Sequence, residues 1–78
     1  MKILEDKVLS ILKEIRDDID YISELKMIDE GILESFDVMQ IAVELSECFN
    51  IIIDSDDIEA ENFNSFEAIC NMVRRKLQ

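Results

Sequence analysis

The 78-residue chain contains one glycine and no proline, histidine or tryptophan, and these absences narrow what it can be. With so few turn-forming residues, we do not expect a sandwich or barrel with many tight turns. Without histidine, imidazole catalysis and histidine ligation of a metal are impossible. The two cysteines, Cys48 and Cys70, are too few for a disulfide framework. We expect both to be reduced thiols, with Cys70 in the core and Cys48 at the edge of the core stripe.

Positive charge is also scarce. Eight Lys and Arg face nineteen Asp and Glu, giving a net charge of −11, and no Lys or Arg lies between Lys26 and Arg74. Nucleic acid and anionic membranes are therefore poor partners, whereas a cationic protein surface is a good one. Solubility alone is the other explanation of the acidity. No apolar run reaches the ~20 residues of a membrane span, and acids interrupt the N-terminal apolar pattern, so we expect a cytoplasmic monomer.

The periodicity of apolar residues predicts an all-α fold, a small four-helix bundle formed by residues 1–78 as a single domain. Helices are expected over residues 2–17, 35–49 and from Asn64 onward, where Glu67 completes a capping box. A short third helix is expected over residues 55–60, with acidic caps. The expected buried stripes of the first and last helices consist of Leu4, Val8, Ile11, Leu12 and Ile15, and of Phe66, Ile69, Cys70, Val73 and Leu77.

The segments between these helices are also apolar in part. Residues 18–34 are predicted to form a long loop that turns at Gly31 and is held to the bundle by Ile19, Ile22, Leu25, Ile28 and Leu33. Residues 51–53 are predicted to be an extended connector whose isoleucines enter the core. The acids after residue 53 do not fit a calcium loop, because Glu59 replaces the required glycine and Ser65 the required glutamate. We expect no metal site.

The 35–49 helix carries two apolar stripes. Val38, Ile41, Ala42, Leu45 and Phe49 form the stripe expected in the core. Phe36, Met39 and Val43 form a second stripe on another face, next to Asp37, Gln40, Glu44 and Glu47. The second stripe is either a wider core contact or an exposed strip that docks on a partner.

Ser35 opens this helix, and a serine there has three candidate roles. Serine is a preferred N-cap residue. A hydrolase nucleophile has no support, because the chain lacks a histidine base and a Gly-x-Ser-x-Gly elbow. A phosphate-bearing serine fits well, since a helix N-terminus offers free N–H groups and the positive end of the helix dipole.

The run Gly31-Ile32-Leu33-Glu34-Ser35-Phe36-Asp37, followed by Leu45, Phe49 and Ile53, resembles the acyl and peptidyl carrier proteins. Their mark is Asp-Ser-Leu at the start of the second helix. The resemblance extends through Asn62-Phe63 and Ser65-Phe66-Glu67-Ala68-Ile69 and covers essentially the whole chain. Glu34 and Phe36 replace the family's Asp and Leu, which indicates a stand-alone carrier outside core fatty-acid synthesis.

The resemblance implies a function without catalysis. Ser35 would carry a covalent 4'-phosphopantetheine arm, attached by a phosphopantetheinyl transferase, and hold an acyl or aminoacyl cargo as a thioester. Loading and transferring enzymes with basic patches would be the other partners. The implied partner-binding residues are Phe36, Met39 and Val43 as apolar contacts, with Glu34, Asp37, Glu44 and Glu47 as the acids.

Two other hypotheses remain open. One is an acidic helical interaction module that binds a basic protein partner without a prosthetic group, in which Ser35 is only a cap. The other is a small acidic regulator that is phosphorylated on Ser35.

Overall fold

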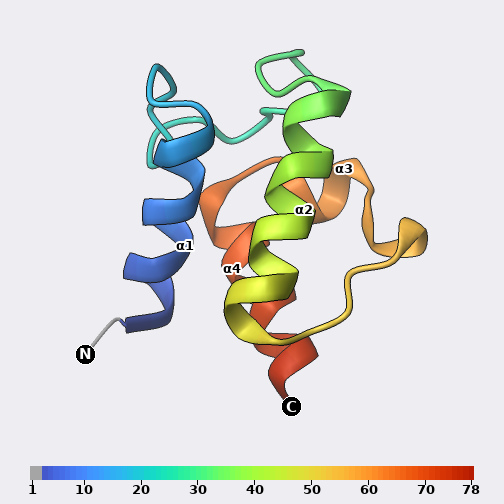
Figure 1. Ribbon diagram of the computed structural model, residues 1–78. Coiled ribbons are helices and arrows are strands. Elements are labelled where there is room, and N and C mark those ends of the chain that lie inside the picture. The colour runs from blue at the N-terminus through green and yellow to red at the C-terminus, as the bar shows by residue number, and fades with distance from the viewer. Residues whose placement is uncertain (1–2) are drawn as a thin grey trace.

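The computed structural model describes residues 3–78, and every regular element in that range is helical (Figure 1). The elements are α1 (Ile3–Ile15), α2 (Ser35–Phe49), a 3₁₀ turn (Ser55–Asp57), α3 (Ala60–Phe63) and α4 (Phe66–Leu77). The predicted all-α bundle with a short third helix is therefore confirmed.

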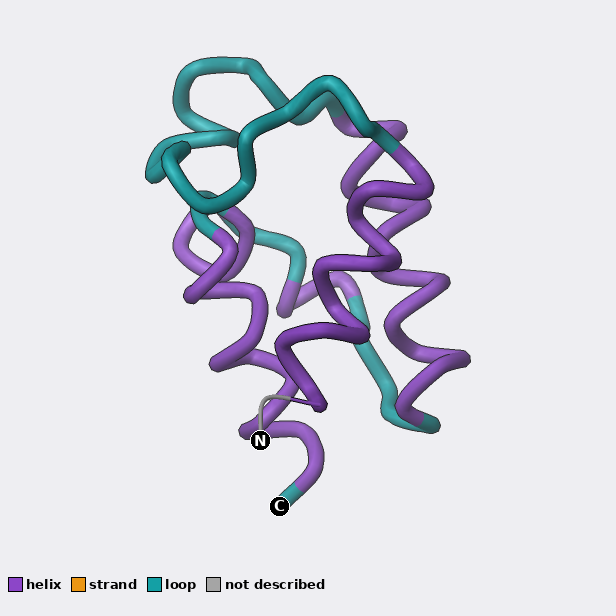
Figure 2. Tube along the Cα trace, turned by 90° about the vertical axis from the view of Figure 1, so that its left-hand side faces the viewer, coloured by secondary structure: helices purple, strands orange, loops and turns teal. Residues whose placement is uncertain are grey.

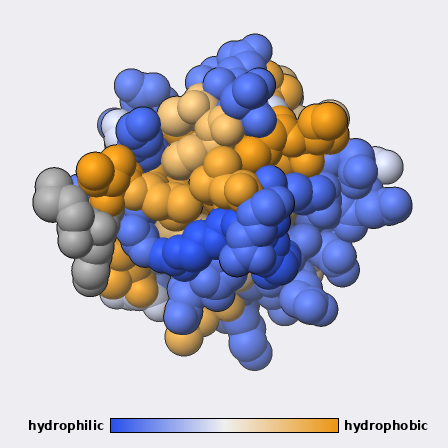
Figure 3. Space-filling model, turned by 90° about the horizontal axis from the view of Figure 1, so that it is seen from below, coloured by the Kyte–Doolittle hydropathy of each residue, from blue (hydrophilic) through white to orange (hydrophobic). Residues whose placement is uncertain are grey.

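Helices α1 and α2 run in opposite directions, with α4 behind them (Figure 1). The long loop between α1 and α2 closes the upper end of the bundle, where α2 begins (Figure 2). The lower end carries an apolar patch bordered by hydrophilic residues (Figure 3). Ser35 therefore lies at the end covered by the long loop.

The core is a single cluster to which all four helices contribute. The predicted stripe of α2 is confirmed, because Val38, Ile41, Ala42 and Leu45 are all buried. Full burial of one aliphatic or aromatic side chain contributes about 1.5–3 kcal/mol, which makes this cluster the main stabilising term. Its fully buried members from the other helices are Val8 and Leu12 of α1, Phe63 of α3, and Ile69, Met72 and Val73 of α4.

The long loop is held to the bundle as predicted, but partly by other side chains. Ile22 and Leu25, expected to be buried, are 65% and 69% exposed, whereas Tyr21 and Met27 are buried. The Tyr21 hydroxyl lies 2.9 Å from the Leu12 carbonyl oxygen, which also accepts the N–H of Arg16, and 2.7 Å from the Arg16 carbonyl oxygen, so it can donate to either carbonyl at the end of α1. Tyr21 therefore lies inward with its hydroxyl bonded, and its neighbour lies outside.

The predicted bounds of the short third helix, residues 55–60, are wrong. These residues divide into the 3₁₀ turn and the first residue of α3, separated by Ile58, at φ −86° and ψ 83°, and Glu59. The Asp54 carboxylate accepts the N–H of Asp56, and the Asp57 carboxylate accepts the N–H of Asp54. These two bonds form a capping box that starts the turn, and the chain leaves helical geometry at Ile58.

The predicted start of the last helix is also corrected. Ser65, not Asn64, is the N-cap of α4, because its hydroxyl accepts the N–H of Ala68 at 3.1 Å. Within α4, Met72 is fully buried, whereas Leu77 in the last turn is 50% exposed. Cys70 is buried as predicted, and this burial raises the pKa of its thiol to about 11.

Three smaller predictions at element ends are also revised. Helix α1 stops at Ile15, short of residue 17, and the predicted start at residue 2 lies outside the described residues. In the 51–53 connector Ile51 and Ile53 pack partly on the core, but Ile52 is 78% exposed. Cys48, expected beside the core stripe of α2, is exposed. Within residues 3–78 no helix has the length and apolar character needed to cross a membrane.

Candidate functional site

Ser35 occupies the first helical position of α2 and is exposed to solvent. Glu34 is the N-cap residue, with an extended backbone at φ −93° and ψ 167°. The Asp37 carboxylate accepts the N–H of Glu34 at 3.1 Å, so the helix start is capped without the Ser35 hydroxyl. The N-cap explanation of Ser35 is therefore wrong, and another reason is needed for a serine at this position.

The predicted exposure of Asp37 is also wrong. The residue was predicted as one of the exposed acids beside the second stripe, but it is only 8% exposed. Its Oδ2 lies 2.7 Å from Nη1 of Arg16, a residue that follows the end of α1. Asp37 is four residues before Ile41 and so lies at the edge of the core face, where a carboxylate needs a partner. It is a structural ion-pair residue and does not belong to an exposed acidic rim.

Arg16 is a residue of this site that the sequence did not point to. Its guanidinium also contacts Asp18, with Nε 2.9 Å from Oδ1 and Nη2 2.9 Å from Oδ2. Hydrogen bonds to Asp18 and then to Asp37 raise the pKa of the Arg16 guanidinium. The same contact with Arg16 lowers the pKa of the Asp18 carboxyl. Because Arg16 is 21 residues from Asp37, no local pattern reveals this pair.

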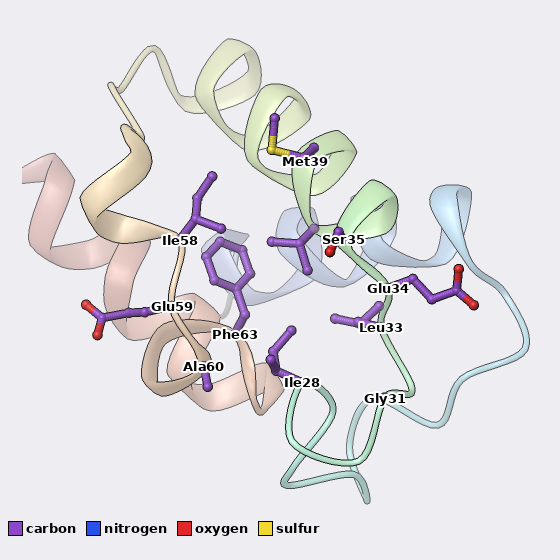
Figure 4. Close-up of a pocket in the computed structure, with 11 residues that line it drawn as sticks. Ile28, Gly31, Leu33, Glu34, Ser35, Met39, Ile58, Glu59, Ala60 and Phe63 are labelled. Atoms are coloured by element: carbon purple, nitrogen blue, oxygen red, sulfur yellow. The ribbon is translucent and has the colours of Figure 1, made fainter.

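Ser35 borders a cleft of about 630 Å³ between the start of α2, the end of the long loop and the segment around α3 (Figure 4). The side chains of Glu34 and Glu59 point away from it, and Ile58 and Phe63 form the wall opposite α2 (Figure 4). Its surface is mainly apolar, which suits an apolar ligand segment. The lining residues are Ile28, Gly31, Leu33, Glu34, Ser35, Val38, Met39, Ile58, Glu59, Ala60 and Phe63.

One end of the cleft is held by Asn64. Its Oδ1 accepts the N–H groups of Ile28 and Asp29 at 2.9 and 3.1 Å, and its carbonyl oxygen accepts the N–H of Met27 at 2.9 Å. These bonds join the long loop to the end of α3, so two walls of the cleft are fixed relative to each other. Gly31, at φ +72°, provides the left-handed turn that brings this loop back towards Ser35.

The α3 wall is also tied to α4. The Asn62 amide nitrogen donates to the Asp57 carbonyl oxygen at 2.8 Å, and Arg75 donates to the Asn62 side-chain oxygen at 3.0 Å. Lys76 lies 2.6 Å from the Asp57 carboxylate and lowers the pKa of that group. The basic end of α4 thus holds the segment that carries Ile58.

The second stripe of α2 lies on the surface. Phe36, Met39 and Val43 are 71%, 56% and 54% exposed, which excludes the wider core contact as its explanation. Glu34, Glu44 and Glu47 are exposed on the same helix or at its cap. The structure thus brings Ser35, three apolar side chains and three acids to the exposed side of α2.

Comparison with protein-family models and with curated proteins found no match for this chain.

Proposed function

We propose that this protein is a carrier that holds an acyl or aminoacyl cargo on a 4'-phosphopantetheine arm attached to Ser35 as a phosphodiester. The observation that carries the proposal is the placement of Ser35. It is exposed at the first position of a 15-residue helix, is not needed as the cap and borders an apolar cleft. The resemblance of residues 31–37 to the carrier-protein motif points to the same serine.

The residues present fit a phosphodiester at this position. The N-terminus of α2 provides the positive end of a helix dipole, and the first-turn N–H groups of a helix have no partner within it. An anion on the Ser35 oxygen is favoured there, typically by about 0.3–1 kcal/mol. The arm supplies a terminal thiol that forms the thioester with the cargo. The chain supplies the attachment oxygen and, beside it, an apolar cleft that can shelter an apolar part of the arm or cargo.

Attachment transfers the phosphopantetheine group from coenzyme A to the Ser35 oxygen. The Ser35 oxygen forms a bond to the pantetheine-linked phosphorus of coenzyme A, and the bond from that phosphorus to the adenosine bisphosphate leaving group breaks. The serine proton passes to a base of the transferase, because no histidine exists in this chain. The carrier itself then presents the thioester and contributes no catalytic residue.

Partner enzymes would dock on the exposed side of α2. Phe36, Met39 and Val43 offer the apolar contacts, and Glu34, Glu44 and Glu47 offer charges to a basic patch. Each rim ion pair is weak, but several together set orientation and association rate. Asp37 is not included, because Arg16 already neutralises it inside the protein.

Co-expression with a phosphopantetheinyl transferase, followed by intact mass measurement, tests the proposal. The wild-type chain and a Ser10→Ala control on the exposed side of α1 should gain one phosphopantetheine, and Ser35→Ala should gain none. Because Ser35 is exposed and does not cap α2, its loss should change the free energy of unfolding by no more than about 0.5 kcal/mol.

The other outcomes identify the rival functions. A gain of a single phosphate on Ser35 would indicate the phosphorylated regulator. An unmodified, folded wild-type chain would contradict the carrier and leave the interaction module, which the exposed apolar strip of α2 also fits.

A further inference from the structure

Arg16 connects three separate parts of the chain close to Ser35. Its guanidinium contacts Asp18 through two nitrogens, Asp37 through Nη1 at 2.7 Å, and the Ile32 carbonyl oxygen through the same Nη1 at 3.5 Å. Asp18 and Arg16 belong to the start of the long loop, Ile32 to its end and Asp37 to the first turn of α2. One side chain therefore joins both ends of the loop to the helix that carries Ser35.

Asp37 passes this restraint to the peptide that precedes Ser35. Its Oδ2 accepts from Arg16 and from the N–H of Glu34, at 2.7 and 3.1 Å. Glu34 is bonded directly to Ser35, so the backbone position of Ser35 depends on where this oxygen is held. Arg16 does not touch Ser35 itself and can act on it only through Asp37 and the loop.

The charge of Arg16 has a second consequence at the same place. Without it, the helix end that receives the phosphate would contain an unpaired carboxylate, and like charges at close range repel. No Lys or Arg lies between Lys26 and Arg74, so that stretch of the chain contains no positive charge to neutralise Asp37. Asp18 shares the guanidinium, and the two acids that border the cleft, Glu34 and Glu59, point away from it (Figure 4).

We propose that Arg16 is a positioning residue for Ser35, which fixes the preceding peptide through Asp37 and offsets the charge of Asp37 at the helix end where the phosphate is attached. This rests on the proposed function of Ser35 and extends it to a residue outside the carrier motif.

The first test is the rate of arm attachment by a phosphopantetheinyl transferase. Arg16→Met should lower kcat/KM roughly tenfold, a change equivalent to about 1.4 kcal/mol. The double variant Arg16→Met/Asp37→Asn should recover to within about threefold of wild type, because it removes the stranded charge. Arg16→Lys should recover only part, since an ammonium lacks the planar fork that reaches Asp18, Asp37 and Ile32 together.

Arg74→Met is the matched control. Arg74 pairs with Glu5 near the start of α1, at the opposite end of the bundle from Ser35, so its loss should leave the attachment rate unchanged. Circular dichroism establishes that each variant is folded. If Arg16→Met does not fold, Arg16→Lys still tests the proposal, with a partial loss of the attachment rate expected.

A second test does not depend on the transferase or on the arm. Phosphoserine placed at position 35 has a second pKa near 6 when unperturbed, which phosphorus NMR can follow. Arg16→Met should raise that pKa relative to the Arg16 protein, and the double variant should lower it again. This measurement remains valid if the wild-type chain is never modified by the transferase, an outcome that would refute the proposed function alone.

Two results would overturn the role of Arg16. One is an attachment rate and a phosphoserine pKa that are both unchanged in folded Arg16→Met. The other is a combination of two findings: attachment is slow in both Arg16→Met and the double variant, and the phosphoserine pKa is the same in wild type and both variants. Arg16 would then support only the fold.

Discussion

Met39→Asp tests whether the second apolar stripe of α2 is a docking surface. Met39 is 56% exposed, whereas Ile41, two residues further along the same helix, is fully buried. A carboxylate at position 39 therefore stays in water. We expect the free energy of unfolding to change by about 0.5 kcal/mol, the usual limit for surface substitutions and close to the difference in helix propensity.

The expected loss in docking is larger. Complete burial of a Met side chain contributes about 1.5–3 kcal/mol, and roughly half of Met39 is still available to be buried by a partner, which gives about 1 kcal/mol. An unpaired carboxylate left in an apolar contact costs at least about 1 kcal/mol more. The sum of about 2 kcal/mol corresponds to roughly thirtyfold weaker binding of the transferase.

The assay measures thermal unfolding by circular dichroism and the KM for arm attachment on the same preparations. Cys48→Asp is the matched control, because it adds the same charge at an exposed position of α2 outside the stripe. Met39→Leu keeps an apolar contact and should behave like wild type. Ile41→Asp should unfold the chain, because it buries a charge in the core.

A folded Met39→Asp protein that is modified with the normal KM would refute docking through this stripe. An unfolded Met39→Asp protein would contradict the exposure of Met39. Equal losses in Met39→Asp and Cys48→Asp would mean that added charge alone weakens docking, and the apolar contact would have no part in it.

Two further predictions concern the polar groups of Tyr21 and Asn64. Burial raises the pKa of Tyr21 to about 12 from its ordinary 10.0, so the neutral phenol is favoured in the folded state. The stability that this contributes is complete below about pH 10 and is lost as the pH rises through about 12. The absorbance of the phenolate form of this single tyrosine follows the titration, and a midpoint near pH 10 in the folded protein would contradict the prediction. Asn64→Ala should lower the free energy of unfolding by about 0.5–1.5 kcal/mol in urea titrations, because the part-buried N–H of Ile28 and the exposed N–H of Asp29 lose their acceptor. Asn71→Ala, at an exposed position of α4, should cost less, and equal costs would show that the Asn64 bonds add no stability.

The regular part of the fold was predictable because its signal is local. The apolar residues of the α2 stripe recur with a 3.6-residue period within fifteen residues, and the helix has the predicted bounds of Ser35 and Phe49. The exposure of Phe36 and Met39 was one of two alternatives, and periodicity could not choose between them. That choice depends on whether another element covers the second face, which only the assembled fold determines.

The wrong predictions concern side chains that bond to groups far away in the sequence. Tyr21 is buried and its hydroxyl donates to the carbonyl groups at the end of α1, whereas Ile22 is exposed, and hydropathy alone ranks these residues the other way. Asn64 was assigned to a cap, but it bonds to loop residues 35 and 36 positions away. Asp37 is different, because a local signal was present. It lies four residues before Ile41, on the border of the core stripe, and should have been expected to need a partner.

The cleft beside Ser35 could not be predicted from the sequence. Its walls come from the long loop, α2 and the segment around α3, and no pattern within one segment describes the space between three. Ser35 was proposed as a site from its motif, and its apolar surroundings became visible only with the fold.

The proposed carrier, with a phosphate on Ser35, would have an electrostatic conflict, since the acids that attract a basic partner would also repel the phosphate. Distance along α2 resolves it for Glu44 and Glu47, whereas Glu34 directly precedes Ser35 and its side chain points away from the cleft (Figure 4). Nine residues separate Ser35 from Glu44, and a rise of 1.5 Å per residue places them about 13 Å apart along the axis. That exceeds the Debye length of about 8 Å at physiological ionic strength, so the distal acids are screened from the phosphate while remaining available to a partner in contact. Asp37 is too close for screening, which is why the pairing with Arg16 matters at this position and at no later turn of the helix.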